Sequence, residues 1–204
     1  MRIAVMTLPD WSFYLNKGVS YPEFRMQFEK NTAAVKAGEV VDVLHSETLP
    51  LNWQRTTRVE KTFHLNDRLR DLLERLDHKI TWLVITEAWC GDSAQTLPAI
   101  SHIADAAHGM IDFKIILRDQ HLELMDAFLT NGSRGIPKLI QLDTEGRVTG
   151  TWGPRPQEAQ NVVTAAKADS NLAANYKEEL HKWYAHDHSR ALQEEILQLL
   201  SGNA

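Results

Sequence analysis

Apolar residues in the N-terminal part of the chain recur at the spacing of an α-helix. The residues that share this apolar face are Tyr21, Phe24, Phe28 and Val35. Charged residues lie between them, so the pattern predicts an amphipathic helix that ends near Gly38. Pro50 suits the first turn of a further short helix. We therefore expect residues 1–60 to be mostly helical.

The centre of the chain alternates between strand-like and helix-like patterns. Ile80–Thr86 is a nearly unbroken run of β-branched and apolar residues, which is typical of a buried parallel strand. The elements predicted here are a short strand at 61–65, a helix capped by Asn66 with Leu69, Leu72, Leu73 and Leu76 on one face, a strand at 80–86, a helix at 91–107, a strand at 111–117, a helix at 120–129, and a hairpin of strands at 136–142 and 148–152. This order predicts an α/β fold, a mixed sheet with helices on both faces.

Pro154 and Pro156 interrupt the pattern after the last strand, and polar helices are predicted at 157–168 and within 172–201. The resulting division is an N-terminal helical extension at 1–60, a central domain at 61–168 and a C-terminal helical tail at 169–204. We expect the extension to pack against the central domain, because burying a large apolar side chain contributes about 1.5–3 kcal/mol. The large side chains concerned are Tyr21, Phe24, Phe28 and Trp53.

Composition narrows the function classes. The 204 residues carry a net charge of -5, so we expect no nucleic-acid partner. No apolar run approaches the roughly 18–20 residues of a membrane span, and Asp10 and Lys17 interrupt the apolar start, so we expect neither a membrane partner nor a signal peptide. Cys90 is the only cysteine. It cannot form an intramolecular disulfide, which favours a reducing compartment and a cytoplasmic location.

The segment Trp89-Cys90-Gly91-Asp92-Ser93 lies between a predicted buried strand and a predicted helix. A cysteine in this place lies beside unpaired backbone N–H groups and the positive end of the helix dipole, and both favour the reactive thiolate. Ser93, one turn later, can donate a hydrogen bond to the sulfur. Asp92 acts in the opposite direction, because a nearby anion raises the pKa of a thiol. The residues alone leave the net shift open.

Two prolines extend this motif into a known pattern. Pro98 lies eight residues after Cys90 inside the predicted helix, and Arg134-Gly135-Ile136-Pro137 comes just before a predicted strand. Together with the Trp-Cys-Gly-x-Ser segment, these motifs resemble thioredoxins over the central part of the chain. The resemblance implies a thioredoxin-like fold in which the bond before Pro137 is cis and faces the sulfur.

The sequence departs from the dithiol members of that family at two places. Ser93 stands where a dithiol thioredoxin has its resolving cysteine, and Val84 stands where the family has a buried carboxylate that accepts a proton. Without a resolving cysteine, only a monothiol cycle remains, in which Cys90 attacks a disulfide and an outside thiol completes the turnover. More narrowly, the segments 87–95, 124–125 and 151–156 resemble a bacterial single-cysteine branch of the family with an added N-terminal helical region.

We assign the candidate catalytic roles to Cys90 and Ser93. The residues expected to bind the ligand are Trp89, Gly91, Asp92, Arg134, Ile136 and Pro137. The backbone of Ile136 would accept an extended peptide or a thiol ligand by strand addition. A cluster of basic residues, with Arg118 and Arg134 further along, either recognises a carboxylate on a small thiol or is a solvated surface. The cluster consists of Arg55, Arg58 and Lys61.

The leading hypothesis for function is monothiol thiol–disulfide exchange. A low-molecular-weight thiol such as glutathione or bacillithiol would be the co-substrate, and small thiols or disulfide-containing proteins would be the partners. Two alternatives stay open: a non-catalytic module that binds an extended peptide or a partner protein beside Pro137, and a peroxide-sensing thiol. No metal or other cofactor is expected, because His181, His186 and His188 lack a spaced set of further ligands.

Overall fold

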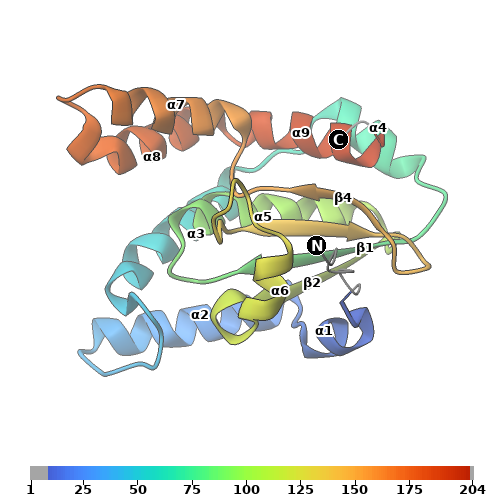
Figure 1. Cartoon of the computed structure of the whole chain (residues 1–204), viewed down its shortest axis with the longest axis horizontal. Coiled ribbons are helices and arrows are strands. Elements are labelled where there is room, and N and C mark those ends of the chain that lie inside the picture. The colour runs from blue at the N-terminus through green and yellow to red at the C-terminus, as the bar shows by residue number, and fades with distance from the viewer. Residues whose placement is uncertain (1–8, 203–204) are drawn as a thin grey trace, which may run out of the picture.

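The computed structural model describes residues 9–202 of the chain. Within these residues, a four-stranded sheet with the order β2-β1-β3-β4 lies at the centre of the molecule (Figure 1). The strands are β1 (Ile80–Thr86), β2 (Ile111–Leu117), β3 (Lys138–Leu142) and β4 (Val148–Trp152). β1 runs parallel to β2 and antiparallel to β3, and β3 runs antiparallel to β4. The predicted mixed sheet is thus confirmed.

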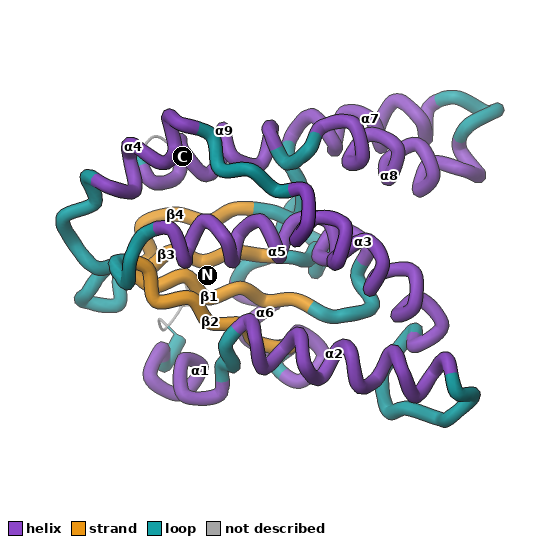
Figure 2. Tube along the Cα trace, turned by 180° about the vertical axis from the view of Figure 1, so that it is seen from behind, coloured by secondary structure: helices purple, strands orange, loops and turns teal. Residues whose placement is uncertain are grey.

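Alternate side chains of β1 belong to two separate apolar clusters, one on each face of the sheet. Trp82 and Val84 point into the larger cluster, which lies under α2 (Tyr21–Lys36), α4 (Asp67–Glu74), α5 (Gly91–Ala106) and the C-terminal helix. Leu83 and Ile85 point into the smaller cluster, which α1 (Trp11–Lys17) and α6 (Leu122–Ala127) cover. Figure 2 shows α5 lying across the first of these faces. A strand buried on both faces explains why its sequence is apolar throughout.

The N-terminal extension is part of the main core. Phe24 and Phe28 are buried in the larger cluster, and Tyr21 and Trp53 pack partly buried against it. The segment before α2 also pairs with the edge of the sheet, where the backbone groups of Val19 and Ile115 exchange two hydrogen bonds of 2.8 Å. The expectation that this segment packs against the central domain is therefore confirmed.

The predicted strand at residues 61–65 is wrong. The helix α3 (Leu49–Thr62) runs through the first part of this segment, because Thr56, Val59 and Phe63 lie at helical spacing and face the core. The residues that follow are extended, but the side chain of Gln193 satisfies their backbone. Its oxygen accepts from Asn66 N–H at 2.8 Å and its nitrogen donates to the His64 carbonyl at 3.1 Å. The boundary drawn between residues 60 and 61 falls inside α3.

Other predicted elements agree with the structure or are shorter than expected. Asn66 caps α4, accepting a hydrogen bond from Leu69 N–H at 2.8 Å, and α5 begins at Gly91 as predicted. The helix expected at 120–129 is a 3₁₀ turn (Arg118–Gln120) followed by the short α6. β3 begins after Pro137, which has no N–H to donate to a neighbouring strand.

The helices that follow the sheet have different surroundings, and the last helix of the predicted central domain pairs with the first α-helix of the C-terminal tail. The helices α7 (Gln157–Ala168) and α8 (Tyr176–Asp187) form a hairpin with a small apolar cluster of its own, and they project beyond the sheet (Figure 1). The last helix, α9 (Arg190–Leu200), returns to pack on β4 and α4. Its buried apolar residues, which belong to the main core, are Leu192, Ile196 and Leu199. None of the helices in the described residues is both long and apolar enough to cross a bilayer.

Because the extension shares the main core, shortening Phe28 should destabilise the whole domain. Phe28 is 3% exposed, whereas Met26 on the same helix is 67% exposed. We expect Phe28→Ala to lower the free energy of unfolding by about 3–5 kcal/mol and Met26→Ala to change it by less than about 0.5 kcal/mol. Urea unfolding followed by circular dichroism measures both. Equal, small effects of the two variants would mean that the extension does not fold with the core.

Candidate functional site

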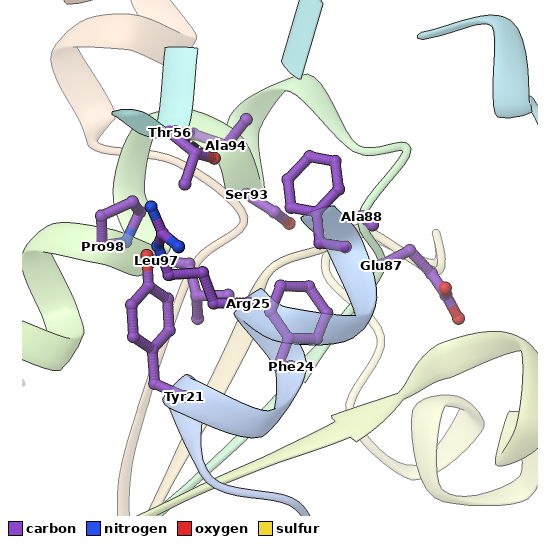
Figure 3. Close-up of a pocket in the computed structure, with 11 residues that line it drawn as sticks. Tyr21, Phe24, Arg25, Thr56, Glu87, Ala88, Ser93, Ala94, Leu97 and Pro98 are labelled. Carbon is purple, nitrogen blue, oxygen red and sulfur yellow. Dashed lines mark hydrogen bonds between the residues drawn. The ribbon is translucent and has the colours of Figure 1, made fainter. Parts of the chain in front are cut away.

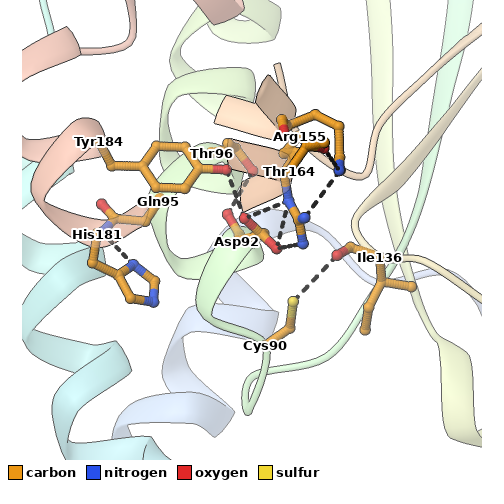
Figure 4. Close-up of polar contacts among 10 residues, drawn as sticks. Cys90, Asp92, Gln95, Thr96, Ile136, Arg155, Thr164, His181 and Tyr184 are labelled. Carbon is orange, nitrogen blue, oxygen red and sulfur yellow. Dashed lines mark hydrogen bonds and ion pairs between the residues drawn. The ribbon is translucent and has the colours of Figure 1, made fainter. Parts of the chain in front are cut away.

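Cys90 is the N-cap residue of α5 and is 8% exposed. Its sulfur lies 3.2 Å from the carbonyl oxygen of Ile136, to which the thiol donates a hydrogen bond (Figure 4). The Ile136–Pro137 peptide bond is cis. The structure thus brings Cys90, Ile136 and Pro137 together, although they lie more than forty residues apart in the chain.

Ser93 is oriented by a hydrogen bond from a second hydroxyl group. Thr86, the last residue of β1, donates to the Ser93 oxygen at 2.6 Å, and both side chains are buried. With its oxygen already accepting, the Ser93 hydroxyl keeps its own proton for another acceptor. A hydrogen bond from Ser93 to the Cys90 sulfur lowers the pKa of the thiol, as do the backbone groups of Asp92 and Ser93. These groups stabilise a thiolate once it forms.

The net effect of the surroundings is nevertheless to raise the pKa of the Cys90 thiol. Burial, the largest cause, raises the pKa of the Cys90 thiol, and the negative charge of Asp92 raises it further. The stabilising hydrogen bonds from Ser93 and the backbone are smaller effects. At neutral pH the sulfur is therefore protonated, which fits the hydrogen bond that it donates to Ile136.

Asp92 lies in the first turn of α5 and is held by a partly buried arginine and a buried tyrosine. Arg155 donates to its carboxylate from Nη2 at 2.6 Å and from Nε at 3.2 Å, and the Tyr184 hydroxyl donates at 2.7 Å (Figure 4). Arg155 follows β4 and Tyr184 belongs to α8, so three distant segments meet at this carboxylate. The sequence analysis placed Asp92 at the site but did not identify Arg155 or Tyr184.

Gly153 lets the chain that carries Arg155 approach the proline loop. Its φ angle is +113°, and a Cβ atom at this position would lie 2.1 Å from the carbonyl oxygen of Pro137. Only glycine adopts this conformation and leaves room for that contact. The close approach brings Arg155 toward Asp92.

The helix α3 and the turn before it hold the segment that precedes Cys90. The Thr48 hydroxyl donates to the Trp89 carbonyl at 3.2 Å, and the amide of Asn52 donates to the Ala88 carbonyl at 3.1 Å. Thr56, one turn further along α3, donates to the Ala94 carbonyl at 3.4 Å. The regular four-residue spacing of these polar residues was the signal in the sequence that the analysis missed.

A cleft of about 940 Å³ opens beside Cys90. One wall comes from the N-terminal extension and includes Thr48, Asn52 and Arg55. The opposite wall comes from α8 and includes His181. Trp89, Cys90, Gly91 and Asp92 lie between the two walls. The extension therefore borders the cleft.

The other residues considered in the sequence analysis do not line the cleft. Arg134 is exposed and forms two hydrogen bonds with Asp126, at 2.6 and 2.7 Å, and it does not line the cleft. Arg118 stacks over Trp89, with its central carbon 4.5 Å from the ring centroid. His186 and His188 are exposed. In the part of the chain that the structure describes, no three potential ligands cluster closely enough to hold a metal ion.

Glu87 is a buried carboxyl group close to the site that the sequence analysis did not consider. It accepts a hydrogen bond from Asp119 N–H at 2.8 Å, and burial raises its pKa to about 7. It borders a pocket of only about 10 Å³ between α2 and α5, which has room for about one water molecule. Figure 3 shows its carboxylate turned away from Tyr21 and Pro98 at the other end of that pocket.

Comparisons with known proteins agree on the fold. A crystal structure of a protein of unknown function from Pseudomonas aeruginosa has a TM-score of 0.62 at 18% identity, covering 96% of this chain and 99% of that one. A crystal structure of an HIV epitope scaffold has a TM-score of 0.64 at 18% identity, covering 96% and 100%. No curated protein matches the sequence significantly.

A family model gives a more specific result than these structures, whose low identity shows a shared fold alone. The model described as Thioredoxin matches residues 41–167, which is more than half of the chain. The matched region contains the sheet, the Cys90 loop, Pro137 and Arg155. The chain therefore belongs to the thioredoxin family.

Proposed function

We propose that this protein carries out monothiol thiol–disulfide exchange through Cys90. The Cys90 thiolate attacks one sulfur of a disulfide, forms a mixed disulfide and releases the other half as a thiolate. An outside thiolate then attacks the ligand sulfur of the mixed disulfide and releases Cys90. The net result is the exchange of one thiol for another, with no change in the number of disulfides.

The observation that carries this proposal is the placement of the Cys90 sulfur at the start of α5, between the Ser93 hydroxyl and the cis-proline loop, beside an open cleft. The Thr86–Ser93 pair supplies a hydrogen bond that stabilises the thiolate as it forms or leaves. Because Ser93 cannot attack a mixed disulfide, the cycle requires an outside thiol as co-substrate. A small thiol or a disulfide-containing protein would be the partner.

A second candidate function is a non-catalytic module that binds an extended peptide or a partner beside Pro137. The burial of Cys90 and its raised pKa favour this alternative, because a protonated thiol is a weak nucleophile. The two functions differ in a measurable way. Exchange requires covalent capture of a disulfide by Cys90, whereas a binding module needs no reaction at the sulfur.

Exchange predicts a mixed disulfide that forms slowly at neutral pH. Because the pKa of Cys90 is raised, each pH unit below that pKa should lower the thiolate fraction and the reaction rate about tenfold. Intact-mass spectrometry after incubation with glutathione disulfide measures the adduct, and added glutathione should reverse it. Cys90→Ser should give no adduct. Failure of the wild-type protein to form any adduct, even at alkaline pH, would favour the binding module.

Two substitutions beside the sulfur should move its pKa in opposite directions. Ser93→Ala removes a hydrogen bond to the thiolate, so the Cys90 pKa should rise. Asp92→Asn removes a nearby negative charge, so the Cys90 pKa should fall. The pH dependence of alkylation by iodoacetamide measures both shifts.

Matched controls for these variants lie on the same helix and on the surface. Ser101→Ala, at a buried serine of α5, and Asp126→Asn, at an exposed carboxylate paired with Arg134, should leave the Cys90 pKa unchanged. A shift of the same sign in Ser93→Ala and Asp92→Asn would contradict the assigned roles of the two side chains.

A further inference from the structure

The helix α3 carries two arginines near the cleft beside Cys90, and one of them, Arg55, lines the cleft. Arg55 and Arg58 on α3 are both partly buried, and burial lowers the pKa of each guanidinium. Arg55 donates to the neutral oxygen of Asn52 at 2.9 Å, and Arg58 donates to the neutral oxygen of Gln95 at 2.5 Å. Neither forms an ion pair with a carboxylate in residues 9–202. Partly buried charges in proteins are normally paired, so this arrangement favours an anionic ligand.

Asp92, the buried carboxylate that lines the cleft, acts on Arg55 through its charge but does not form an ion pair with it. Asp92 is already held by Arg155 and Tyr184. Other carboxylates that line the cleft, Glu47 and Glu178, are exposed, and Glu178 pairs with Lys182 at 2.9 Å. The inner end of the cleft is therefore positive.

A chain of hydrogen bonds fixes the tautomer of His181, so that its Nε2 carries a proton and can donate a hydrogen bond. Because the Gln95 oxygen accepts from Arg58, its amide nitrogen faces His181 Nδ1, at 3.1 Å, and donates to it (Figure 4). Nδ1 is thus an acceptor, and the ring proton of neutral His181 lies on Nε2. Burial and the charges of Arg55, Arg155 and Arg58 lower the pKa of His181 to about 3, which keeps the ring neutral.

Arg55 and His181 converge on the residue next to the thiol. A Cβ atom on Gly91 would lie 3.0 Å from His181 Nε2 and 3.3 Å from Arg55 Nη1. The two donors come from opposite walls of the cleft, α3 and α8, and meet one residue from Cys90. An anionic group that binds there can belong to a molecule whose sulfur reaches Cys90.

We propose that this cleft selects small anionic thiols and disulfides, whose carboxylate binds between Arg55 and His181 while their sulfur reaches Cys90. The volume of the cleft, about 940 Å³, suits a small molecule. The identity of the ligand as a thiol or disulfide rests on the exchange chemistry proposed above. The preference for an anion does not rest on that chemistry, and a separate experiment measures it.

Alkylation of Cys90 by iodoacetate and by iodoacetamide tests the anion preference without any disulfide. In both reactions the Cys90 thiolate forms a carbon–sulfur bond and releases iodide, and the reagents differ chiefly in the carboxylate. Both rates depend on the same thiolate fraction, so a change in the pKa of Cys90 cancels in their ratio. The ratio of iodoacetate to iodoacetamide rates in the folded protein should exceed that of the urea-unfolded chain about tenfold, as expected for a charge-assisted hydrogen bond.

Variants of Arg55 test whether the cleft is the cause of this preference for iodoacetate. Arg55→Gln should reduce the ratio to that of the unfolded chain, and Arg55→Lys, which keeps the charge, should retain a higher ratio than Arg55→Gln. The matched control is Arg68→Gln on α4, where the arginine pairs with Glu194 and does not line the cleft. It has the same change in net charge and should leave the ratio unchanged.

Several results would overturn the inference. A wild-type ratio equal to that of the unfolded chain rejects the anion site without the need for any variant. Equal losses in Arg55→Gln and Arg68→Gln reject the assignment to the cleft, because net charge alone would then explain them. A raised ratio without mixed-disulfide formation rejects the exchange chemistry and leaves an anion-selective cleft. Mixed-disulfide formation without a raised ratio rejects the anion site alone.

Discussion

Asp92 brings a carboxylate into the first turn of α5, and Arg155 and Tyr184 hold it there. The α7–α8 hairpin has its own small apolar cluster, and polar contacts from Tyr184 and His181 join it to α5. Leaving a buried carboxylate without these partners would be strongly unfavourable. The wall that α8 contributes to the cleft therefore depends on this carboxylate, and so does the place of His181.

The Asp92 carboxylate that contacts Arg155 and Tyr184 also makes the Cys90 thiol harder to deprotonate. Asp92 lies close enough to the sulfur to raise the pKa of the thiol, and burial raises it further. Ser93 and the backbone at the start of α5 act in the opposite direction. The site thus combines groups that stabilise a thiolate with surroundings that keep the resting thiol protonated. Because a protonated thiol is a weak nucleophile, the proposed exchange depends on how well the cleft holds a disulfide beside Cys90.

The central elements of the fold could be predicted because their patterns are local. The apolar run of β1, the cap at Asn66 and the start of α5 at Gly91 all follow from short-range backbone preferences and hydrophobic periodicity. The strand predicted at 61–65 was wrong because its alternation was weak and α3 continued into it. The side chain of Gln193, about 130 residues further along the chain, then satisfied the extended segment in place of a neighbouring strand.

The sequence by itself determined that Cys90 lies at the start of a helix after a buried strand, because these features depend on short motifs, and the resemblance to thioredoxins implied the core fold and the place of Pro137 beside the sulfur. Only the tertiary structure decided what surrounds the sulfur. Arg155 and Tyr184 contact Asp92, and His181 lies beside Gly91, although the order of these segments along the chain carries no information about their distance in space. Burial is likewise a property of the packed molecule, and it is the largest effect on the Cys90 pKa. The direction of that shift therefore required the whole fold.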